Sequence, residues 1–426
     1  MSRLTIVGTG YVGLTTGACF AHLGHDVVCA DVDPAKVDAL DRGEIPIVEA
    51  GLEQLVAEGV RAGRLSFVLG AANAVGDADV VFLCVPTPQG DDGSADLSYI
   101  EDAAREIGPH LPYESVVVKK STVPVGSTRV VERVLARPDV KVVSNPEFLR
   151  EGSAVSDFLH PDRIVVGSTD ESAAIKVSSL YTKIAAPVIV TDPASAETIK
   201  YAANAFLATK LSYINAIAAI CEGVGADVND VVLGLGYDQR IGHEFLRPGP
   251  GWGGSCFPKD TKALLRIAEV AGYPFDLLSG VVAVNEQQFI RVADKVRDAA
   301  GGSLTGTLIG VWGLTFKAGT DDLRDSPSLG IITRLLAGGA RVRAHDPTVA
   351  GPKPGLPEGI EVTTDPYAVA DGADVLAVLT EWDEYRWLDP GKVAETIGTK
   401  QVVDARNLLD RNEWVRLGFG YRGIGR

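Results

Sequence analysis

Residues 4–13 read LTIVGTGYVG, an apolar stretch that runs directly into the glycines Gly8, Gly10 and Gly13. In this arrangement the first glycine permits a tight turn, the second lets the backbone approach a pyrophosphate, and the third lets a helix pack closely on a strand. Asp31 ends the next apolar run, 23 residues after Gly8, where a carboxylate can accept hydrogen bonds from an adenosine ribose. The stretch therefore predicts a dinucleotide-binding domain at the start of the chain.

The same residues indicate which dinucleotide is bound. The carboxylate of Asp31 would repel a 2′-phosphate, so NAD is expected rather than NADP. Lys36 follows closely and is assigned to the adenosine end of the cofactor. The alternative is a glycine turn with a purely structural role.

Strand-like apolar runs alternate with amphipathic stretches in two blocks of the chain. The first block contains the runs Leu4–Val7, Asp26–Ala30, Val80–Val85, Ser115–Lys119, Lys141–Ser144 and Ile164–Gly167. The second contains Thr307–Trp312, Arg341–His345, Val375–Thr380 and Val402–Val403. Alternation of this kind is typical of βαβ units with a parallel sheet.

Between the two blocks the strand signals disappear. Apolar residues such as Ile199, Ala203 and Phe206 recur at helical spacing. The predicted fold class is α/β, with two Rossmann-like doubly wound parallel-sheet domains joined by a central all-helical segment that contains a long connecting helix. The expected domains are 1–195, 196–300 and 301–426.

Composition narrows the function classes. The 426 residues include 56 acidic and 40 basic ones, a formal net charge of −16, which disfavours a nucleic-acid surface without excluding an anionic ligand. The apolar stretch from Ala202 to Ile220 carries Lys210, so we expect a buried helix rather than a membrane span. No export signal is recognised near Met1, and a cytoplasmic protein without membrane or nucleic-acid partners is expected.

Five cysteines occur without a CxxC pair, so neither a disulfide framework nor a metal site is expected. Four of them lie in apolar patterns and are interpreted as inert core residues: Cys19, Cys29, Cys84 and Cys221. Cys256 differs, because it lies in the glycine-rich segment GPGWGGSCFPKD at residues 249–260. Glycines leave room for a substrate carbon, and nearby polar groups can lower the pKa of a thiol. Cys256 is the candidate nucleophile.

Several further motifs point to one family. They are GTGYVG from Gly8, VPTP from Val85, KSTVPVGS from Lys120, SNPEFLREGSA from Ser144, KYAANAF from Lys200, GGSCFPKD from Gly253, FKAGTDDLRDSP from Phe316 and TEW from Thr380. Together they resemble the UDP-glucose/GDP-mannose dehydrogenase family, in order, from the first strand to about Asn407. The segments SAVSDFLHPDRIVVG and TEW are more similar to the branch that acts on UDP-glucose.

The resemblance implies an NAD-dependent, four-electron oxidation of the C6 alcohol of UDP-glucose to UDP-glucuronate, with two NAD and one water. Cys256 would carry a thiohemiacetal and then a thioester. The same chemistry on GDP-mannose or a UDP-N-acetylhexosamine is an alternative. Two further alternatives are a two-electron hydroxyacid dehydrogenase and a non-catalytic regulatory protein that binds NAD and a nucleotide.

The resemblance also assigns catalytic residues. Lys200 would stabilise the oxyanion and Asn204 would add a hydrogen bond from the same helical face. Asp260 would orient water or accept a proton, while Thr122 and Glu147 would hold the water. Each residue also has a structural alternative. Lys200 and Glu147 could be solvated surface residues, Asp260 could cap a helix, and Thr122 could bond a local turn.

Binding residues are implied in the same way. The cofactor is assigned to Gly8, Gly10, Tyr11, Val12, Gly13, Asp31, Lys36, Val85, Thr87, Thr122, Glu151, Lys259 and Arg324. The substrate is assigned to Glu147, Phe148, Leu149, Lys200, Asn204, Arg240, Phe245, Gly253 and Lys317. Glu151 would contact the nicotinamide end, and if residues 147–151 are helical it shares one side with Glu147.

The second α/β block is expected to bind the UDP-sugar, because its glycines Gly310 and Gly313 give only a degenerate dinucleotide pattern. Lys317 would reach the sugar or a phosphate, and Arg324 would bond a pyrophosphate as a planar fork. Arg240 resembles an arginine that acts across a dimer interface, with a surface ion pair as the alternative. The apolar face of the long helix predicts a homodimer or a higher homo-oligomer.

Overall fold

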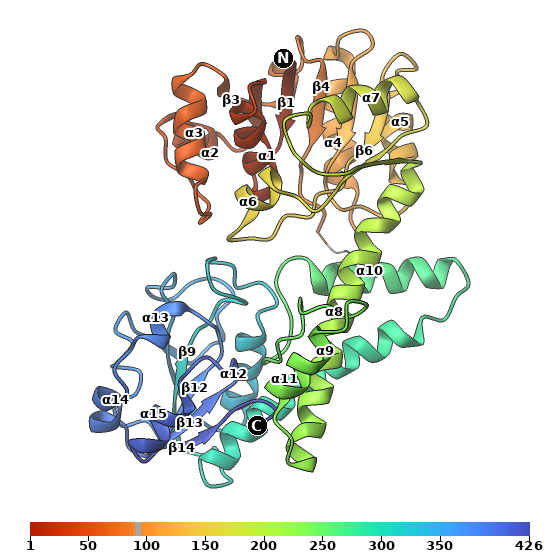
Figure 1. The fold of residues 1–426 in the computed structure, drawn as a ribbon. Coiled ribbons are helices and arrows are strands. Elements are labelled where there is room, and N and C mark those ends of the chain that lie inside the picture. Colours follow the sequence, from red (N-terminus) through yellow and green to blue (C-terminus); the bar gives the residue numbers. More distant parts are fainter. Residues whose placement is uncertain (89, 91–94) are drawn as a thin grey trace. The chain divides into compact units, whose positions relative to one another are not determined.

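The computed structural model describes residues 1–88, 90 and 95–426 (Figure 1). The chain forms two compact units. The first unit comprises Met1–Ala203 and Lys262–Ala271, and the second comprises Asn204–Thr261 and Gly272–Arg426. Two helices, α8 (Pro193–Val224) and α10 (Phe257–Val270), contribute residues to both units. The proposed division into domains 1–195, 196–300 and 301–426 stays a prediction.

The first unit is built on an eight-stranded sheet with the strand order β3-β2-β1-β4-β5-β6-β7-β8. Its strands are β1 (Arg3–Val7), β2 (Asp26–Asp31), β3 (Leu65–Leu69), β4 (Val80–Leu83), β5 (Val116–Lys119), β6 (Lys141–Ser144), β7 (Ile164–Gly167) and β8 (Val188–Thr191). Its helices before α8 are α1 (Tyr11–His22), α2 (Pro34–Asp41), α3 (Leu52–Arg61), α4 (Ser98–Ile107), α5 (Ser127–Leu135), α6 (Ala154–Leu159) and α7 (Glu171–Ser179). The order of the first six strands is that of a doubly wound dinucleotide-binding sheet.

The second unit repeats this topology in a six-stranded parallel sheet with the order β11-β10-β9-β12-β13-β14. Its strands are β9 (Leu308–Trp312), β10 (Arg341–His345), β11 (Ile360–Val362), β12 (Val375–Val378), β13 (Gln401–Asp404) and β14 (Gly420–Arg422). Its remaining helices are α9 (Val228–Gly236), α11 (Asp276–Ala299), α12 (Pro327–Ala337), α13 (Asp383–Arg386), α14 (Pro390–Thr396) and α15 (Arg411–Arg416). The predicted fold class is confirmed.

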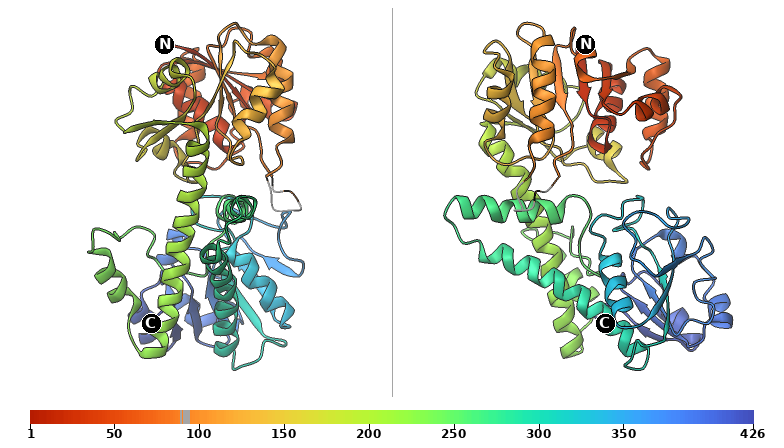
Figure 2. Two further views of the ribbon diagram at one scale, coloured as in Figure 1. Left: turned by 90° about the vertical axis from the view of Figure 1, so that its right-hand side faces the viewer. Right: turned by 180° about the vertical axis from the view of Figure 1, so that it is seen from behind.

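Both faces of each sheet are covered by helices (Figure 2). Alternate residues of β4 show this directly, because Val80 and Phe82 belong to one buried apolar cluster while Val81 and Leu83 belong to another. Successive side chains of a strand point to opposite faces, so a strand that is apolar at every position is buried on both. This explains why the central strands are recognisable in the sequence as continuous apolar runs.

Residues 193–300 contain helices and no strand, as predicted. Among the described residues, α8 is the helix with the length and mean hydropathy of a membrane span. It also carries the buried polar residues Glu197, Lys200 and Asn204. Buried charged side chains such as Glu197 and Lys200 fit the core helix of a folded unit better than a helix in lipid.

The structure departs from the expected parallel sheet in one respect. β7 pairs with β6 in the antiparallel direction, so β7 and β8 run against the other six strands. Four strands were also not predicted: β3, β8, β11 and β14. All four lie at the edges of the two sheets. Two of them, β11 and β14, have only three residues each, whereas β3 (LSFVL) and β8 (VIVT) are apolar runs that could have been recognised in the sequence.

Candidate functional site

The glycine turn and Asp31 meet at the carboxyl end of β1. Gly8 has φ +98°, and a Cβ there would lie 2.7 Å from the carbonyl oxygen of Cys84, so only glycine fits. Oδ2 of Asp31 accepts hydrogen bonds from the backbone N–H (2.8 Å) and the hydroxyl (2.6 Å) of Thr9. Burial raises the pKa of Asp31, but these bonds outweigh it, and the net pKa is lowered. The turn therefore holds an ionised carboxylate at the end of β2.

The other predicted cofactor residues of the first unit follow parallel strands of the same sheet. Tyr11 is the first residue of α1, with Val12 and Gly13 in the same turn, and Lys36 lies exposed on α2. Val85 and Thr87 follow β4, and Thr122 lies between β5 and α5. The carboxyl ends of parallel strands share one edge, and that edge is where doubly wound sheets bind ligands. The hydroxyl of Ser121 donates to the carbonyl of Val85 (2.6 Å) and joins two of these segments.

The segment after β6 carries Glu147 and Glu151, and the condition under which the two would share one side, that residues 147–151 are helical, is not met. Residues 145–150 are irregular, and α6 begins only at Ala154. Glu49 accepts hydrogen bonds from the backbone N–H groups of Gly152 (2.7 Å) and Ala154 (2.8 Å), so a distant carboxylate satisfies backbone donors at and just before the start of α6. The Glu147 side chain is buried, whereas Glu151 is half-buried.

Lys200 forms a buried ion pair with Glu147. The Nζ of Lys200 lies 2.9 Å from Oε1 of Glu147, and Oε2 accepts from the backbone N–H of Leu149 at 2.7 Å. Burial raises the pKa of the Glu147 carboxyl, but the Lys200 ammonium and the Leu149 N–H lower it more. Phe148 lies beneath the lysine, with its ring centroid 5.4 Å from Nζ. Four predicted residues are thus brought together, with Glu147 ionised.

A second polar group lies at the start of α10, in the second unit. Asp260 is fully buried, and its two carboxylate oxygens accept from Lys259 Nζ and from Asn204 Nδ2, each at 2.6 Å. The backbone N–H of Asp260 donates to the carbonyl of Cys256 at 2.8 Å, in the first turn of the helix. Cys256 therefore directly precedes the first turn of α10, and its Sγ lies 3.6 Å from the hydroxyl oxygen of Ser255.

Buried side chains from two helices hold the glycine-rich segment that precedes Cys256. Asn285 accepts from the backbone N–H of Trp252 (2.8 Å) and donates to its carbonyl (2.9 Å), while the indole N–H of Trp252 donates to Ser212 (2.8 Å). A Cβ on Gly253 would lie 1.9 Å from the carbonyl oxygen of Asp325, so the close backbone approach requires glycine. Asn285 and Ser212 were not predicted from the sequence. Polar residues inside the apolar pattern of a helix were the only signal for them.

In the second sheet, Lys317 and Arg324 both lie between β9 and α12. The Arg324 guanidinium forms a bidentate pair with Asp322, with Nε–Oδ1 at 2.9 Å and Nη2–Oδ2 at 2.7 Å. Asp346 follows β10 as Asp31 ends β2, but its Oδ2 accepts from the backbone of Leu314 (2.8 Å) and from Trp382 Nε1 (3.1 Å). Its side chain is buried and, like the Asp31 carboxylate, it is held by the loop that follows the first strand of its sheet.

The last two predicted residues follow α9. Arg240 is exposed and forms an ion pair with Asp238 of the same segment, with Nη2–Oδ2 at 2.6 Å. Within one chain the arrangement is thus the surface ion pair named as the alternative. Phe245 adopts φ +59° and its ring centroid lies 6.5 Å from that of Phe257 at the start of α10. The predicted substrate residue Phe245 is therefore adjacent to the helix that follows Cys256.

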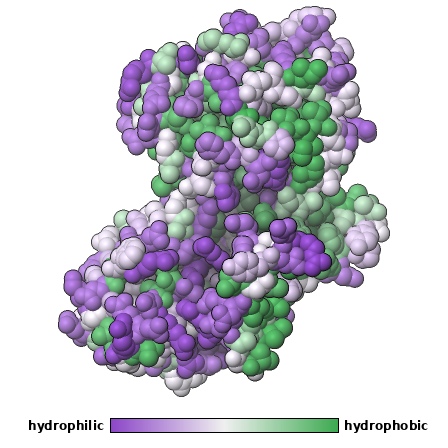
Figure 3. Space-filling view, viewed as in Figure 1, coloured by the Kyte–Doolittle hydropathy of each residue, from purple (hydrophilic) through white to green (hydrophobic). Residues whose placement is uncertain are grey.

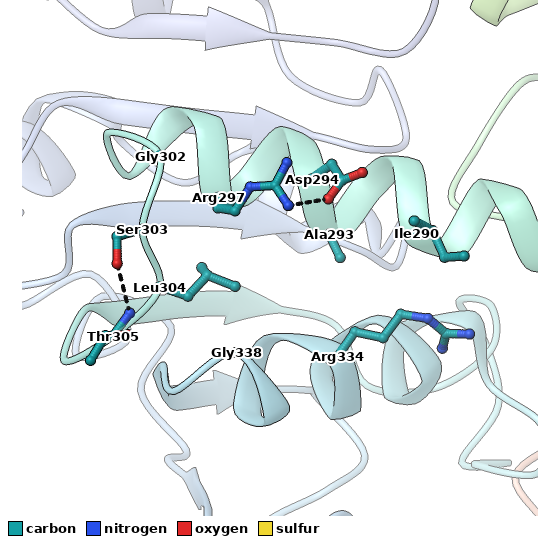
Figure 4. A pocket seen from close by; sticks show the side chains of 10 residues that line it. All are labelled: Ile290, Ala293, Asp294, Arg297, Gly302, Ser303, Leu304, Thr305, Arg334 and Gly338. Atoms are coloured by element: carbon teal, nitrogen blue, oxygen red, sulfur yellow. Dashed lines mark hydrogen bonds and ion pairs between the residues drawn. The ribbon is translucent and has the colours of Figure 1, made fainter.

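A pocket of about 490 Å³ lies between α11, α12 and the segment that joins α11 to β9 (Figure 4). Its lining residues are Ile290, Ala293, Asp294, Arg297, Gly302, Ser303, Leu304, Thr305, Arg334 and Gly338. None of them is a predicted site residue. Arg297 points to Asp294 and pairs with it at 2.6 Å. The pocket adjoins the amino end of β9, opposite the strand ends that carry Lys317 and Arg324.

Comparison with known proteins gives a consistent pattern along the chain. The UDP-glucose/GDP-mannose dehydrogenase family is matched in three parts: the NAD binding domain by residues 2–185, the central domain by 194–287 and the UDP binding domain by 310–411. The matched NAD binding domain contains the glycine turn and Asp31, and the matched central domain contains Lys200, Asn204 and Cys256.

Individual relatives are similar to this protein over the whole length of the chain. A UDP-glucose 6-dehydrogenase of Rhizobium meliloti (strain 1021) is 48% identical over 434 residues, which cover 100% of this chain and 99% of that protein. The structure of a UDP-glucose dehydrogenase from the hyperthermophilic archaeon Pyrobaculum islandicum has a TM-score of 0.91 at 39% identity, covering 100% of this chain and 98% of the other. A UDP-D-ManNAc dehydrogenase from Pyrococcus horikoshii has a TM-score of 0.88 at 28% identity, covering 100% and 99%.

Proposed function

This chain belongs to the UDP-glucose/GDP-mannose dehydrogenase family and binds NAD, and on that premise we propose that it oxidises the C6 alcohol of UDP-glucose to the carboxylate of UDP-glucuronate. The reaction removes four electrons from one carbon, uses two NAD and consumes one water. When bound, NAD supplies the hydride acceptor for both oxidations. The glycine turn at Gly8 and the ionised carboxylate of Asp31 fit its pyrophosphate and adenosine ribose.

The observation that carries the proposal is the polar group at the start of α10. Cys256 stands at the N-terminal end of this helix, one turn before a buried carboxylate that is bonded to Lys259 and Asn204. A thiol in this setting can add to the aldehyde formed in the first oxidation and give a thiohemiacetal on Cys256. Loss of the second hydride from that carbon leaves a thioester. Water then releases the carboxylate and returns the thiol, so no aldehyde needs to leave the protein.

Lys200 and Glu147 supply the remaining roles in this proposal. The ammonium of Lys200 stabilises the oxyanion on C6, and Glu147, ionised beside it, accepts a proton from the attacking water that Thr122 helps to hold. Asn204, one helical turn after Lys200 on α8, adds a neutral donor. Arg324 bonds a pyrophosphate, and Lys317 contacts the sugar or a phosphate. Glu151 contacts the nicotinamide end of the cofactor.

UDP-glucose is preferred to the sibling substrates for a specific reason. The relative from Rhizobium meliloti, whose name specifies UDP-glucose, is 48% identical, whereas the structure of a dehydrogenase of an N-acetylated UDP-sugar is only 28% identical. Purified protein supplied with NAD and, in turn, UDP-glucose, GDP-mannose and UDP-N-acetylmannosamine tests the choice. We expect two NADH for each UDP-glucose consumed and no comparable rate with the others. Turnover of another sugar nucleotide without turnover of UDP-glucose would refute the substrate.

The nucleophile is tested by Cys256→Ser, with Cys221→Ser as the matched control. Cys221 lies in α8 with its side chain buried in the apolar core of the second unit. We expect Cys256→Ser to abolish complete oxidation to UDP-glucuronate and Cys221→Ser to retain it, both measured by NADH yield per sugar. Two NADH per sugar at the wild-type rate from Cys256→Ser would refute the role of the thiol.

The protein is further proposed to be a cytoplasmic homodimer that pairs through α8. Phe206, Tyr213 and Ile220 are spaced seven residues apart on this helix and are 64%, 52% and 57% exposed. Residues at this spacing share one helical face, and contiguous exposed apolar faces of this kind mark protein interfaces. Figure 3 shows hydrophobic side chains gathered over the C-terminal part of α8 and over α9. Arg240 in the segment after α9 is proposed to reach the substrate of the partner subunit.

A further inference from the structure

Glu197 is a buried carboxylate that the proposed mechanism does not use. It lies on α8 in the first unit, three residues before Lys200, and its side chain is only 2% exposed. Buried carboxylates are rare unless charges and hydrogen bonds compensate for the lost hydration.

The carboxylate of Glu197 binds the start of α5. Oε2 accepts from the backbone N–H of Gly126 at 2.5 Å, and Oε1 accepts from the hydroxyl (2.7 Å) and the backbone N–H (3.2 Å) of Thr128. The hydroxyl of Ser127 contributes a longer bond to Oε1 at 3.3 Å. The first N–H groups of a helix have no partner within the helix, and their dipole favours a negative charge. Glu197 thus caps α5 from a position 70 residues later in the chain.

The same carboxylate also binds the end of β5. Lys119, the last residue of that strand, forms a buried ion pair with Oε1 of Glu197 and donates to the hydroxyl of Ser127 at 2.6 Å. Burial lowers the pKa of Lys119, and Glu197 opposes that shift. Lys119 and Gly126 are the two ends of the segment that carries Thr122. One carboxylate therefore holds both ends of this segment.

Glu197 and Lys200 lie on the same side of α8, because residues three apart on a helix are neighbours. We propose that Glu197 is a positioning residue, which fixes the Thr122 segment relative to Lys200 so that water is held where the thioester on C6 is attacked. The proposal rests on the function proposed above. It assigns no contact between Glu197 and the substrate.

The test compares Glu197→Gln with the wild-type protein. A glutamine keeps the size of the side chain and can still accept from Gly126, but it loses the charge that holds Lys119 and α5. Because misplacement by ~1 Å can cost about 100-fold in rate, we expect kcat to fall by at least ~10-fold while KM for UDP-glucose changes little. Since hydrolysis is the step that needs held water, a rapid burst of NADH should precede the slow steady state.

Hydroxylamine separates positioning from a merely structural role. It attacks a thioester directly to give a hydroxamate and the free thiol, and it needs no water held by Thr122. We expect it to raise the steady-state rate of Glu197→Gln and to leave that of the wild-type protein nearly unchanged. A wild-type kcat, or a reduced kcat with neither a burst nor acceleration by hydroxylamine, would overturn the proposal.

Two further variants keep the test decisive. Thr128→Val removes one donor and leaves the ion pair, so it covers the case in which Glu197→Gln does not fold, and we expect a smaller burst of the same kind. Glu222→Gln is the matched control, because Glu222 also lies on α8 and accepts from a backbone N–H (Gly425, 2.7 Å) and a lysine (Lys295, 2.9 Å). It should show no burst. If the wild-type protein does not oxidise UDP-glucose, the proposed function fails instead, independently of Glu197.

Discussion

The ammonium of Lys200 and the carboxylate of Glu147 lie 2.9 Å apart, with side chains that are 4% and 6% exposed. The resemblance assigns these residues separate roles, one at an oxyanion and one at a water. In the structure each is the counter-ion of the other. Desolvation of two charges is compensated only while both are present, so removal of either leaves an uncompensated buried charge.

Lys200→Met should therefore destabilise the protein as well as inactivate it. We expect the free energy of unfolding to fall by ~3 kcal/mol or more, and the double variant Lys200→Met/Glu147→Gln to recover most of that loss because both charges are gone. Urea denaturation measures both effects. Lys210→Met is the control, since this lysine of the same helix donates to the carbonyl of Ile241 (3.0 Å) in an exposed bond, and its loss should cost about 1 kcal/mol or less. Equal stability of the single and double variants would contradict the coupling.

Lys120 gives the first unit a pH-dependent stability. Its side chain is 4% exposed and donates to Asn145 Oδ1 (3.2 Å) and the Tyr181 hydroxyl (3.4 Å), both neutral. Burial lowers the pKa of Lys120 to about 8. Between this value and the usual lysine pKa of about 10.4, the unfolded chain binds a proton that the folded chain does not, so stability rises with pH.

The variant Lys120→Met isolates this effect. The unfolding free energy of the wild-type protein relative to Lys120→Met should increase by about 3 kcal/mol as pH rises from 7.5 towards 10.5. Denaturation series at several pH values measure the difference, in which other titrations cancel. The exposed Lys392, replaced by methionine, provides the flat reference. A difference that stays constant for Lys120→Met would contradict the lowered pKa.

Asp31 should determine the preference for NAD over NADP. Its carboxylate is held by Thr9 at the end of β2, where it repels a 2′-phosphate. Because a hydrogen bond to a charged group contributes about 1.5–3 kcal/mol, Asp31→Ala should raise KM for NAD by roughly 10- to 150-fold and reduce the discrimination against NADP. Initial rates with each cofactor measure this. Asp346→Ala changes the corresponding aspartate of the second sheet and should leave the ratio of the rates with NAD and NADP unchanged. If this ratio changed in Asp346→Ala but not in Asp31→Ala, the assignment of Asp31 would be wrong.

Charge on the exposed face of α8 should prevent dimer formation. Phe206→Glu and Tyr213→Glu each place a carboxylate on the apolar face, where pairing would bury it. We expect sedimentation velocity to show monomers for both variants and dimers for the wild-type protein. Ile175→Glu is the control, because Ile175 is 62% exposed on α7 and lies outside this face. Dimers that persist in both α8 variants would place the interface elsewhere.

The strands show how much of the fold the local hydropathy pattern predicts. The central strands of both sheets were predicted because burial on two faces leaves a continuous apolar run in the sequence. The edge strands were not predicted: β11 and β14 have only three residues each, whereas β8 (Val188–Thr191) is apolar in sequence although its residues are mostly exposed in the fold. The segment after β6 is irregular, so the four-residue spacing of Glu147 and Glu151 does not place them on one helical side.

Local sequence is enough to predict the α/β class, the dinucleotide turn with Asp31, the helical middle of the chain and the family, because each is encoded by spacing within a short stretch or by motifs in order. The partners of the buried charges, in contrast, follow only from the folded arrangement of the chain. Lys200 bonds Glu147 across 53 residues and Asn204 bonds Asp260 across 56. Hydropathy and periodicity record that a side chain is buried, but the group that compensates its charge depends on which loops the sheet brings together.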